Sequence, residues 1–296
     1  MMKEVHNKLS YSQINNFHTC PRKWRYEYID KSIGKQESIF LSYGSAVHLV
    51  LENLLKLQGS EYDNKTLELG STEDEVIEIG LERIRSEIEP FKDEGDIELL
   101  LQQARLNFDL FKHKKGFYSF LNDSPKIIGV EDDFVLTIPT VLDDEDVDIN
   151  VRGFIDLIYE DKDGIVVVDH KTSKKKFQKQ KRREDLQLPI YFMAVEDKYG
   201  EYPYKGTYNF TKLNQFQDTL FVPKVTSKME DEMNERGPKN IYGRDPITTK
   251  REIIKTFKAM NDEKKRSVAK PSPLCYWCNA KDICPDRSYW KPKDER

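Results

Sequence analysis

The 296-residue chain has only four cysteines and no long hydrophobic run. No stretch approaches the ~18 consecutive apolar residues that a membrane-spanning helix needs, so we expect no membrane contact. The opening residues Met1–Lys8 lack the apolar segment of a secretory signal, and we therefore expect a cytoplasmic protein. In that reducing compartment, cysteines that cluster along a sequence are more often metal ligands than disulfides.

Apolar residues are scarce, and no charge of one sign dominates. Hydrophobic residues make up 38% of the chain and charged residues 34%, against about 45–50% and 25% in typical globular proteins. The 15 Phe and 15 Tyr can still build a core, and the length fits one large domain or one domain with an insertion. The net charge of -4 excludes binding of nucleic acid through an overall basic charge, but residues 143–148 are acidic and residues 174–183 are basic, and such local patches govern binding.

Helical patterns dominate the N-terminal part. Residues 9–30 predict two short helices separated at Pro21, the first with Ser10 or Ser12 as its cap. Residues 44–58 predict a further helix, because their apolar side chains recur at helical spacing. That apolar face consists of Val47, Val50, Leu51, Leu54 and Leu55.

Two longer helices are expected within residues 72–121. Thr72 and Glu75 have the spacing of a capping box at the start of the first, and Pro90 ends it. We interpret the surrounding range 59–124 as a helical insertion between the first helices and the sheet. The apolar stripe of the second helix is expected to contain Leu99, Leu106, Leu110 and Phe111.

Strand patterns follow the insertion. Residues 147–159 alternate apolar and polar side chains, and Asp161–Gly164 has the composition of a hairpin turn. Residues 185–199 predict a helix with Pro189 in its first turn. Further strands are expected at 126–138, 165–171, 205–212 and 216–222, and further helices near 226–235 and 248–261.

Two aspartates and a lysine occupy the expected hairpin. Alternation places Asp169 and Lys171 on one face of their strand and His170 on the other, and Asp156 lies on the preceding strand. Antiparallel neighbours are about 4.8 Å apart, so the two carboxylates can converge on one Mg²⁺. Such an ion polarises a phosphate and activates water, and Lys171 would contact the same phosphate or orient that water. Solvated charges at strand ends are the alternative, but charges clustered in this way favour a functional site.

Three other polar residues are candidates for the same site. His48 lies in the 44–58 helix, where a lone histidine is either structural or a ligand that suits Mn²⁺ better than Mg²⁺. Gln187 and Tyr191 are four residues apart and share a helix face. That face either packs on the protein surface or contacts DNA near the scissile bond.

The cysteines form a second pattern. Cys275, Cys278 and Cys284 are close together near the end of the chain, and Cys20 is remote. Thiolates suit zinc and iron–sulfur clusters alike. From the spacing alone, both remain possible.

Six ordered motifs, taken together, resemble one known family. Four of them are similar to the RecB-like branch of the PD-(D/E)XK nuclease superfamily, and the opening and closing motifs resemble its iron–sulfur members. These members include the AddB nuclease domain and the CRISPR-associated or phage single-domain exonucleases. The motifs are Tyr11-Ser12 through Cys20–Lys23, Gly44–His48, Gly153–Asp156, Asp169–Thr172, Gln187–Tyr191 and Cys275 through Pro285.

The resemblance implies an α/β fold of the restriction-endonuclease type. Its core would be a mixed central sheet flanked by helices, in a single nuclease domain spanning 1–296. The catalytic sheet and helix would lie in 125–222. A [4Fe–4S] cluster would join the segments 1–30 and 271–296 through Cys20, Cys275, Cys278 and Cys284.

The resemblance also implies roles for the candidate residues. Asp156, Asp169 and Lys171 would be catalytic, and the metal would be held by His48, Asp156, Asp169 and the peptide carbonyl of His170. Many family members have Glu where this chain has Asp169, and the shorter side chain would shift the ion slightly. The substrate-binding pair would be Gln187 and Tyr191.

These observations predict a DNA exonuclease that uses Mg²⁺ or Mn²⁺ and acts on single-stranded ends in recombination, repair or processing. The run 174–183 either follows the DNA backbone or is a solvated loop. Alternatives are a DNA-binding subunit without catalysis, and an endonuclease or flap-cutting partner of a helicase or recombination protein. The oligomeric state stays open. Four aromatic residues are expected in the core, with base stacking as the alternative: Trp24, Tyr26, Tyr28 and Phe40.

Overall fold

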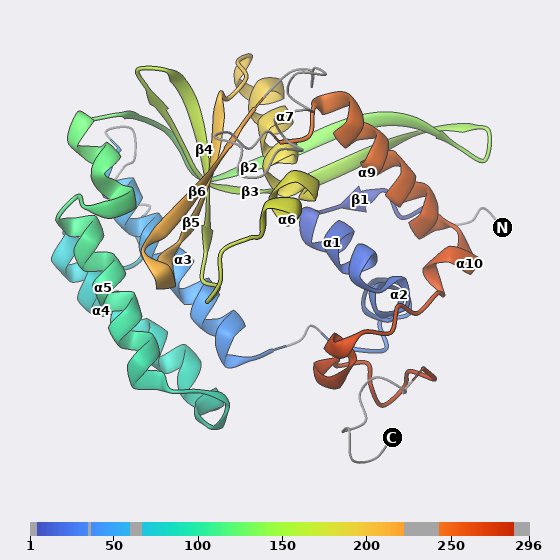
Figure 1. Ribbon diagram of the computed structural model, residues 1–296, viewed down its shortest axis with the longest axis horizontal. Coiled ribbons are helices and arrows are strands. Elements are labelled where there is room, and N and C mark those ends of the chain that lie inside the picture. Colours follow the sequence, from blue (N-terminus) through green and yellow to red (C-terminus); the bar gives the residue numbers. More distant parts are fainter. Residues whose placement is uncertain (1–4, 35–36, 60–66, 222–242, 287–296) are drawn as a thin grey trace. The chain divides into compact units, whose positions relative to one another are not determined.

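Figure 1 shows a computed structural model of the chain, which describes residues 5–34, 37–59, 67–221 and 243–286. The chain divides into two compact units. The first contains Met1–Gln36, Val135–Gly153 and Ile247–Arg296, and the second contains Glu37–Phe134 and Phe154–Pro246. The assignment of 1–296 to a single nuclease domain stays a prediction.

A mixed sheet forms the centre of the second unit. The C-terminal part of β3 pairs antiparallel with β4, β4 pairs parallel with β5, and β5 pairs antiparallel with β6. β2 pairs with β3, and both strands have residues in each unit. The mixed sheet flanked by helices is confirmed. The strands are β2 (Lys126–Leu142), β3 (Glu145–Asp161), β4 (Gly164–Lys171), β5 (Lys205–Phe210) and β6 (Gln215–Leu220).

Helices cover one face of this sheet with a continuous apolar core (Figure 1). Leu157 of β3 and Val166 and Val168 of β4 belong to that core, together with side chains of three long helices. Burial of this apolar surface is the main force that holds the helices on the sheet. The helical elements of this layer are α3 (Ile39–Gln58), α4 (Glu73–Ile88), η2 (Glu89–Glu94), α5 (Ile97–Lys112) and η3 (Gly116–Asp123).

The helix α7 (Gln187–Tyr199) packs close to β5. A Cβ atom on Gly206 would lie 2.8 Å from the Phe192 ring and 3.0 Å from Leu188, so only glycine permits this approach. Strand alternation turns Asp169 away from the face of Val166 and Val168. Two short elements complete the unit around this region, α6 (Lys179–Glu184) and η4 (Thr211–Leu213).

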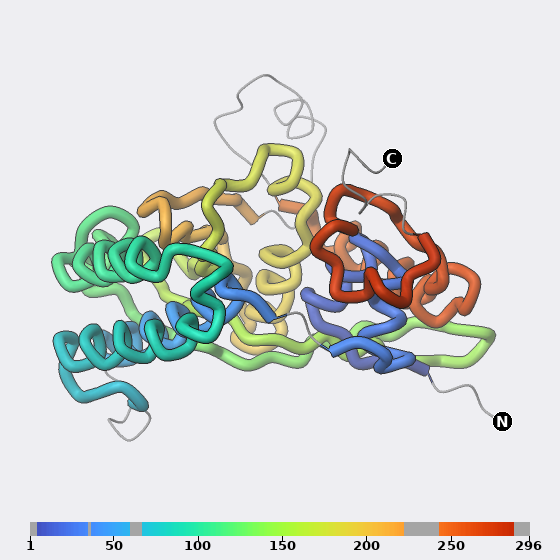
Figure 2. Tube along the Cα trace, turned by 90° about the horizontal axis from the view of Figure 1, so that it is seen from below, coloured from blue at the N-terminus to red at the C-terminus, as the bar shows by residue number. Residues whose placement is uncertain are grey.

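The first unit joins the two ends of the described chain. In Figure 2 the blue N-terminal helices lie beside the red C-terminal segment, where Arg22 N donates to Val268 O (3.1 Å) and Lys270 Nζ donates to His18 O (2.9 Å). Trp24 is fully buried, which confirms it as a core residue, whereas Phe40 of the second unit, also expected in the core, is 45% exposed. The elements are β1 (Lys8–Leu9), which pairs parallel with β3 at Asn150 and Val151, α1 (Tyr11–Thr19), α2 (Pro21–Tyr28), α9 (Pro246–Asn261), α10 (Glu263–Arg266) and η5 (Pro273–Trp277).

Local signals located several boundaries correctly. Pro21 begins α2, Ser10 Oγ accepts a hydrogen bond from Gln13 N at the start of α1, and Thr72 and Glu75 form the capping box of α4. The helix predicted to end at Pro90 ends at Ile88, and the chain continues as the 3₁₀ helix η2.

Two helix predictions were wrong in detail. The helix predicted from residue 44 begins at Ile39, because Ser38 Oγ accepts from Leu41 N and caps it there. In α5, Leu99 and Leu106 are 45% and 53% exposed. The run Leu99-Leu100-Leu101 allows several apolar stripes, and tertiary packing selected one that contains Leu100, Leu101, Ala104, Phe108 and Phe111.

The helix predicted near 226–235 lies outside the described residues. Among the described residues, no helix combines the length and the apolar character needed to cross a bilayer.

Candidate active site

The hairpin of β3 and β4 brings the two predicted aspartates together in the second unit. Leu157 pairs with Val168, so Asp156 and Asp169 are neighbouring positions on the opposite face of the hairpin. Both side chains are buried. The backbone N–H of His170 donates to Asp156 Oδ2 at 2.6 Å, which fixes one oxygen of this carboxylate and leaves Oδ1 for another partner.

His48 and a residue absent from the sequence-based prediction, Glu131, complete a compact group. His48 Nδ1 lies 3.5 Å from Asp156 Oδ1 and 3.9 Å from Glu131 Oε1. One ligand atom of each of these three residues lies within 4.8 Å of the other two. Their side chains therefore form a mixed nitrogen and oxygen group of the size that one metal ion needs.

Glu131 occupies an unusual backbone conformation. Its φ of 49° is left-handed although it lies within strand β2, a conformation that costs free energy for a residue with a side chain. Such strain is typical of functional sites. The sequence held one signal, since Glu131-Asp132-Asp133 interrupts an otherwise apolar strand.

Asp169 is held by a second network from α7. Gln187 Nε2 donates to Asp169 Oδ1 (2.5 Å) and to the Tyr191 hydroxyl (2.9 Å), and Gln187 Oε1 accepts from Lys171 Nζ (2.7 Å). Lys171 Nζ also lies 2.6 Å from Asp169 Oδ2. Gln187 and Tyr191 are buried, so in this structure they orient the aspartate and the lysine.

Opposite charges change the proton affinities of His48 and Asp156. Burial alone would lower the pKa of His48, but the adjacent Asp156 carboxylate and a hydrogen bond with Glu131 raise it well above its ordinary value. Burial would raise the pKa of Asp156, yet His48 and the His170 N–H lower it to about 2. Asp156 is therefore an anion at neutral pH.

Burial dominates at the other two carboxylates. Burial raises the pKa of Asp169 to about 6. The positive charge of Lys171 opposes this rise, and the negative charge of Asp156 adds to it. Burial also raises the pKa of Glu131, assisted by Asp156 and opposed by His48. For Lys171, burial would lower the pKa, but the Asp169 carboxylate raises it and keeps the ammonium charged. Several carboxylates crowded in one buried place attract a cation.

The His170 side chain is not part of this group. Its Nδ1 lies 3.0 Å from Asn209 Nδ2, an amide nitrogen that can only donate, so Nδ1 is the acceptor. Burial lowers the pKa of His170 to about 4. The imidazole is therefore neutral. Asn209 Nδ2 also donates to the Tyr118 hydroxyl (3.2 Å), and this hydroxyl donates to Asn107 Oδ1 on α5 (2.8 Å).

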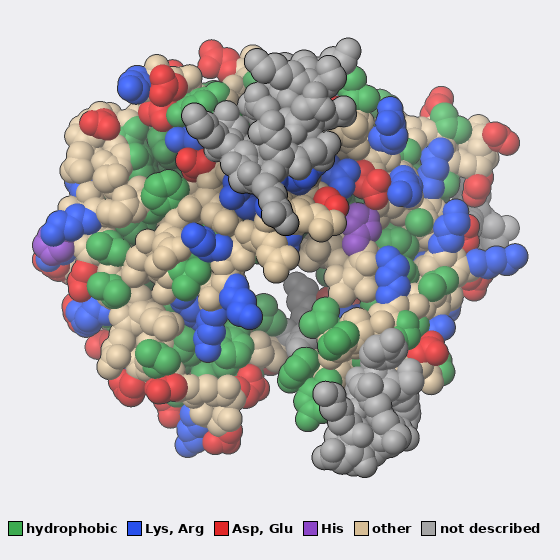
Figure 3. Space-filling view, viewed as in Figure 1, with side chains coloured by type: hydrophobic (Ala, Val, Ile, Leu, Met, Phe, Trp, Pro, Cys, Tyr) green, Lys and Arg blue, Asp and Glu red, His purple; other side chains and the backbone are tan. Residues whose placement is uncertain are grey.

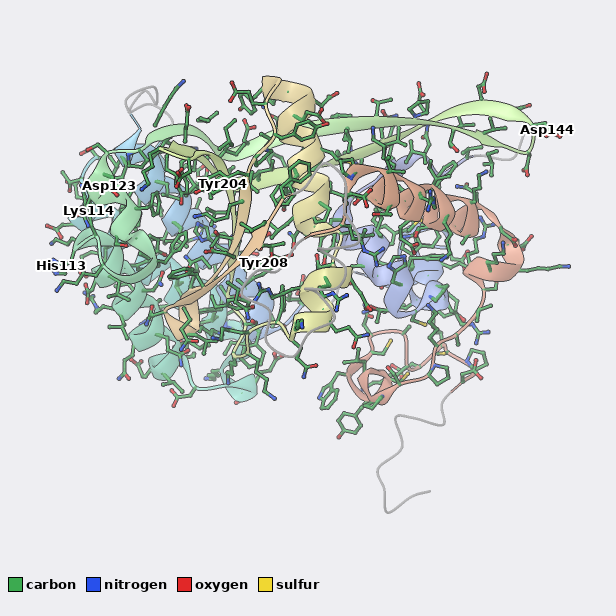
Figure 4. The ribbon with its side chains drawn as sticks, turned by 45° about the horizontal axis from the view of Figure 1, so that its top comes forward. His113, Lys114, Asp123, Asp144, Tyr204 and Tyr208 are labelled. Atoms are coloured by element: carbon green, nitrogen blue, oxygen red, sulfur yellow. The ribbon has the colours of Figure 1, made fainter. Side chains whose placement is uncertain are left out.

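Tyr208 of β5, labelled in Figure 4, lies beside Lys171. Its ring centroid lies 5.7 Å from Lys171 Nζ, and its hydroxyl donates to Asp185 Oδ1 (3.2 Å). Figure 4 also places Tyr204, just before β5, closer to the start of that strand.

The donor set fits a divalent ion. Carboxylate oxygens are the ligands that Mg²⁺ and Mn²⁺ prefer, and an imidazole shifts that preference toward Mn²⁺. Two buried aspartates lie on adjacent strands, with a lysine two residues beyond the second aspartate and a histidine from the flanking helix α3. This candidate site has the groups that a metal-dependent phosphodiester hydrolase needs.

Comparison with known proteins agrees with this class. The sequence model of the PD-(D/E)XK nuclease superfamily matches residues 8–285. The chain therefore belongs to the PD-(D/E)XK nuclease superfamily, whose members are metal-dependent nucleases.

The other comparisons add little. No curated protein sequence matches the chain significantly. A solved structure titled "Crystal structure of SSO0001" is similar over 96% of this chain and 89% of its own, with 14% sequence identity and a TM-score of 0.41. A similarity at this level supports no further argument.

The four cysteines lie together in the first unit without forming a compact ligand group. All four line one cavity of about 200 Å³, beside Arg22. None of them forms a disulfide. Among the described residues, the group with three ligand atoms within 4.8 Å is that of His48, and the cysteines form no such group. The predicted iron–sulfur cluster is not confirmed.

The basic run 174–183 is partly anchored. Phe177 N donates to Gln217 Oε1 and Gln217 Nε2 donates to Phe177 O, both at 3.1 Å, so the segment is held against β6. Arg182 Nη2 donates to Asp218 O. Lys174, Lys175 and Lys176 remain exposed directly after the catalytic strand.

Proposed function

We propose that this nuclease is a deoxyribonuclease that uses Mg²⁺ or Mn²⁺ and degrades single-stranded DNA from its ends. The observation that carries the proposal is the convergence of His48, Glu131 and Asp156 beside the Asp169–Lys171 pair, all in the second unit. A buried cluster of this kind is expensive to assemble and is typical of catalytic sites.

The residues divide into three roles in this proposal. His48, Asp156 and Asp169 would hold the ion, as the family resemblance implies, with Glu131 as an added ligand and the His170 carbonyl as a further one. Lys171 would stabilise the charge that develops on the phosphate or orient the attacking water. Gln187 and Tyr191 would hold Asp169 and Lys171 at a fixed separation.

The bound ion would polarise the phosphate, acidify the attacking water and stabilise the leaving oxygen. The chain itself keeps Asp156 ionised, because its pKa is lowered to about 2. It also keeps Lys171 protonated beside Asp169. Both charges are therefore in place before DNA arrives.

The surroundings of the site support contact with a nucleic-acid backbone. The basic segment 174–183 follows Lys171 directly and would bind the backbone without regard to sequence. A role in recombination, repair or processing, alone or with a helicase or recombination protein, accords with that chemistry.

A [4Fe–4S] cluster is proposed in the first unit. Its ligands would be Cys20, Cys275, Cys278 and Cys284, which line one cavity, and thiolates are the ligands such clusters prefer. The cluster would cross-link segments far apart in the sequence and so stabilise the fold. The thiols fit a reducing cytoplasm, which stays a prediction.

The test is digestion of end-labelled DNA by protein purified without oxygen, with Mg²⁺ or Mn²⁺. We expect linear single-stranded DNA to be degraded to short products, linear duplex to be degraded more slowly, and circular single-stranded DNA to resist. Asp169→Asn should cut DNA at least roughly 10²-fold more slowly, whereas Asp163→Asn, in the exposed β3–β4 turn, should match the wild type. Equal products from Asp169→Asn and wild type would mean a contaminating nuclease and would refute the proposal.

A further inference from the structure

Lys212 is a buried lysine for which the described part of the chain provides no acidic partner. Its side chain, in the 3₁₀ turn η4, is only 9% exposed. Among the described residues, no carboxylate or hydrogen-bond acceptor contacts its ammonium group. The rings of Phe40 and Tyr43 lie beside it, and the charge of Lys174 acts on it. Lysine is rarely buried unless it is paired, so a lysine with no counterion within 5–34, 37–59, 67–221 and 243–286 is unusual.

The neighbours of Lys212 concentrate positive charge. Its Nζ lies 4.2 Å from the ring centroid of Tyr43 and 5.1 Å from that of Phe40, and Lys174 Nζ lies 5.2 Å from the same Phe40 ring. Ring faces attract cations, so both ammonium groups lie at the Phe40 ring, and the charge of Lys174 acts on Lys212. Phe40 is nevertheless 45% exposed, so the cluster opens to solvent.

The cluster adjoins the catalytic lysine. Thr211, next to Lys212, donates from Oγ1 to the backbone carbonyl of Lys171 (3.4 Å). A Cβ on Gly44 would lie 3.1 Å from Thr172 Oγ1, so the first turns of α3 pass closely over the chain that leaves β4. The turn η4 is held by Asn107, whose Nδ2 donates to Thr211 O (3.2 Å).

We propose that Lys174 and Lys212, supported by Phe40, bind a backbone phosphate of the DNA strand next to the phosphate that is cut. The proposal rests on the nuclease function proposed above and deepens it. A phosphodiester is the expected ligand because it brings one negative charge and acceptor oxygens to two ammonium groups. The ring of Phe40 limits the movement of both lysines.

Electrostatics supports an anion at this place. Burial, together with the charge of Lys174, lowers the pKa of Lys212 to about 8, which reflects the strain of an uncompensated charge. A phosphate would relieve that strain. On the face shown in Figure 3, basic side chains (blue) are mixed with acidic ones (red). This face is not basic overall, so attraction of a DNA phosphate requires a local cluster of positive charge.

The test measures binding of fluorescein-labelled oligo(dT) in EDTA, where no cleavage occurs, as a function of salt. Lys174→Gln/Lys212→Gln should bind about tenfold more weakly or worse, the effect of losing a charged hydrogen bond. Its plot of log K against log salt should be shallower by about 0.7, because one phosphate contact is lost. Lys174→Arg/Lys212→Arg should restore binding, since arginine also binds phosphate.

The controls use exposed residues at the other end of β4 and β5. Lys162→Gln, in the β3–β4 turn, removes an exposed lysine, and Tyr202→Ala removes an aromatic residue of nearly the same exposure as Phe40. Both should bind like the wild type. The melting temperature of the Gln double variant should stay close to that of the wild type, because Lys174 is exposed and Lys212 has no acidic partner among the described residues.

Two results have different meanings. A double variant with the salt dependence of Lys162→Gln would overturn the phosphate subsite, even if the protein cuts DNA normally. Wild-type protein that binds oligo(dT) with the predicted salt dependence but does not cut it with Mg²⁺ or Mn²⁺ would refute the nuclease proposal and leave the subsite supported.

Discussion

The two units hold their candidate ligands in different ways. In the second unit, strand register and a hydrogen-bond network fix each group, as shown by the His170 N–H on Asp156 and by Gln187 between Asp169 and Lys171. In the first unit, four cysteines face one cavity from short turns and helix ends without closing into a compact group. We infer that the oxygen and nitrogen site is preorganised, whereas the thiol site depends on what it binds.

The largest expected effect is on catalysis in the second unit. Asp169→Asn should lower the rate of DNA cleavage by roughly 10²–10³-fold or more, since removing one preorganised charged group costs this much in comparable sites. The fold should survive, because the amide can still accept from Gln187. Circular dichroism and melting temperature check the fold. Loss of activity with loss of structure would contradict a purely catalytic role.

The second effect concerns the first unit. If the proposed cluster is present, Cys20→Ser should remove its visible absorption and increase protease sensitivity, because the cross-link would close a very long loop worth about 3–5 kcal/mol in chain entropy. Iron content, absorption spectrum and limited proteolysis measure this. A colourless Cys20→Ser protein with wild-type protease resistance would show that the thiol site is not structural.

A smaller effect is expected at Glu131. Glu131→Gln should raise the Mn²⁺ concentration needed for half-maximal activity by about 10–100-fold, the usual range for groups that support a metal site. Glu160→Gln, on an exposed position of β3, is the matched control. Identical metal requirements in the two variants would remove Glu131 from the ligand set.

The smallest effect is a pH dependence of DNA binding. Because the pKa of Lys212 is lowered to about 8, its charge is present below pH 8 and is lost as the pH rises through that value. Binding of oligo(dT) in EDTA should weaken a few-fold from pH 7 to 9, less if bound phosphate raises the pKa. Lys212→Arg should bind equally at both pH values, with Lys174 and Tyr43 unchanged beside it; the same decline in this variant would exclude Lys212 as the cause.

The lowered pKa of Lys212 also affects the free energy of unfolding, which should increase with pH although DNA binding weakens. Folded Lys212 loses its proton near pH 8, whereas an unfolded lysine keeps it to about pH 10.4. The unfolded state thus binds more protons in that interval, and the free energy of unfolding should rise with pH there. Lys212→Met should lack this rise.

Sequence periodicity predicted the central hairpin because each step is local. Alternation placed Asp156 and Asp169 on one face, and the turn Asp161–Gly164 set the register. Pro21 and the Thr72 capping box act within a few residues of themselves, so they too could be read from sequence.

The remaining features depend on tertiary structure. Glu131 itself has a left-handed backbone conformation inside a strand, and the alternation of side chains along a strand does not predict such a residue. Lys212 and Phe40 are far apart in sequence and meet only because η4 and the start of α3 fold together. The buried face of α5 was misassigned because its apolar run permits several registers.

Pulsed electron paramagnetic resonance of bound Mn²⁺ tests the central claim most directly. We predict one tightly bound ion per chain with a nitrogen coupling from His48, no coupling in His48→Gln, and no tight binding in Asp156→Asn. Tight Mn²⁺ binding that is unchanged in Asp156→Asn and shows no nitrogen coupling in the wild type would contradict the account.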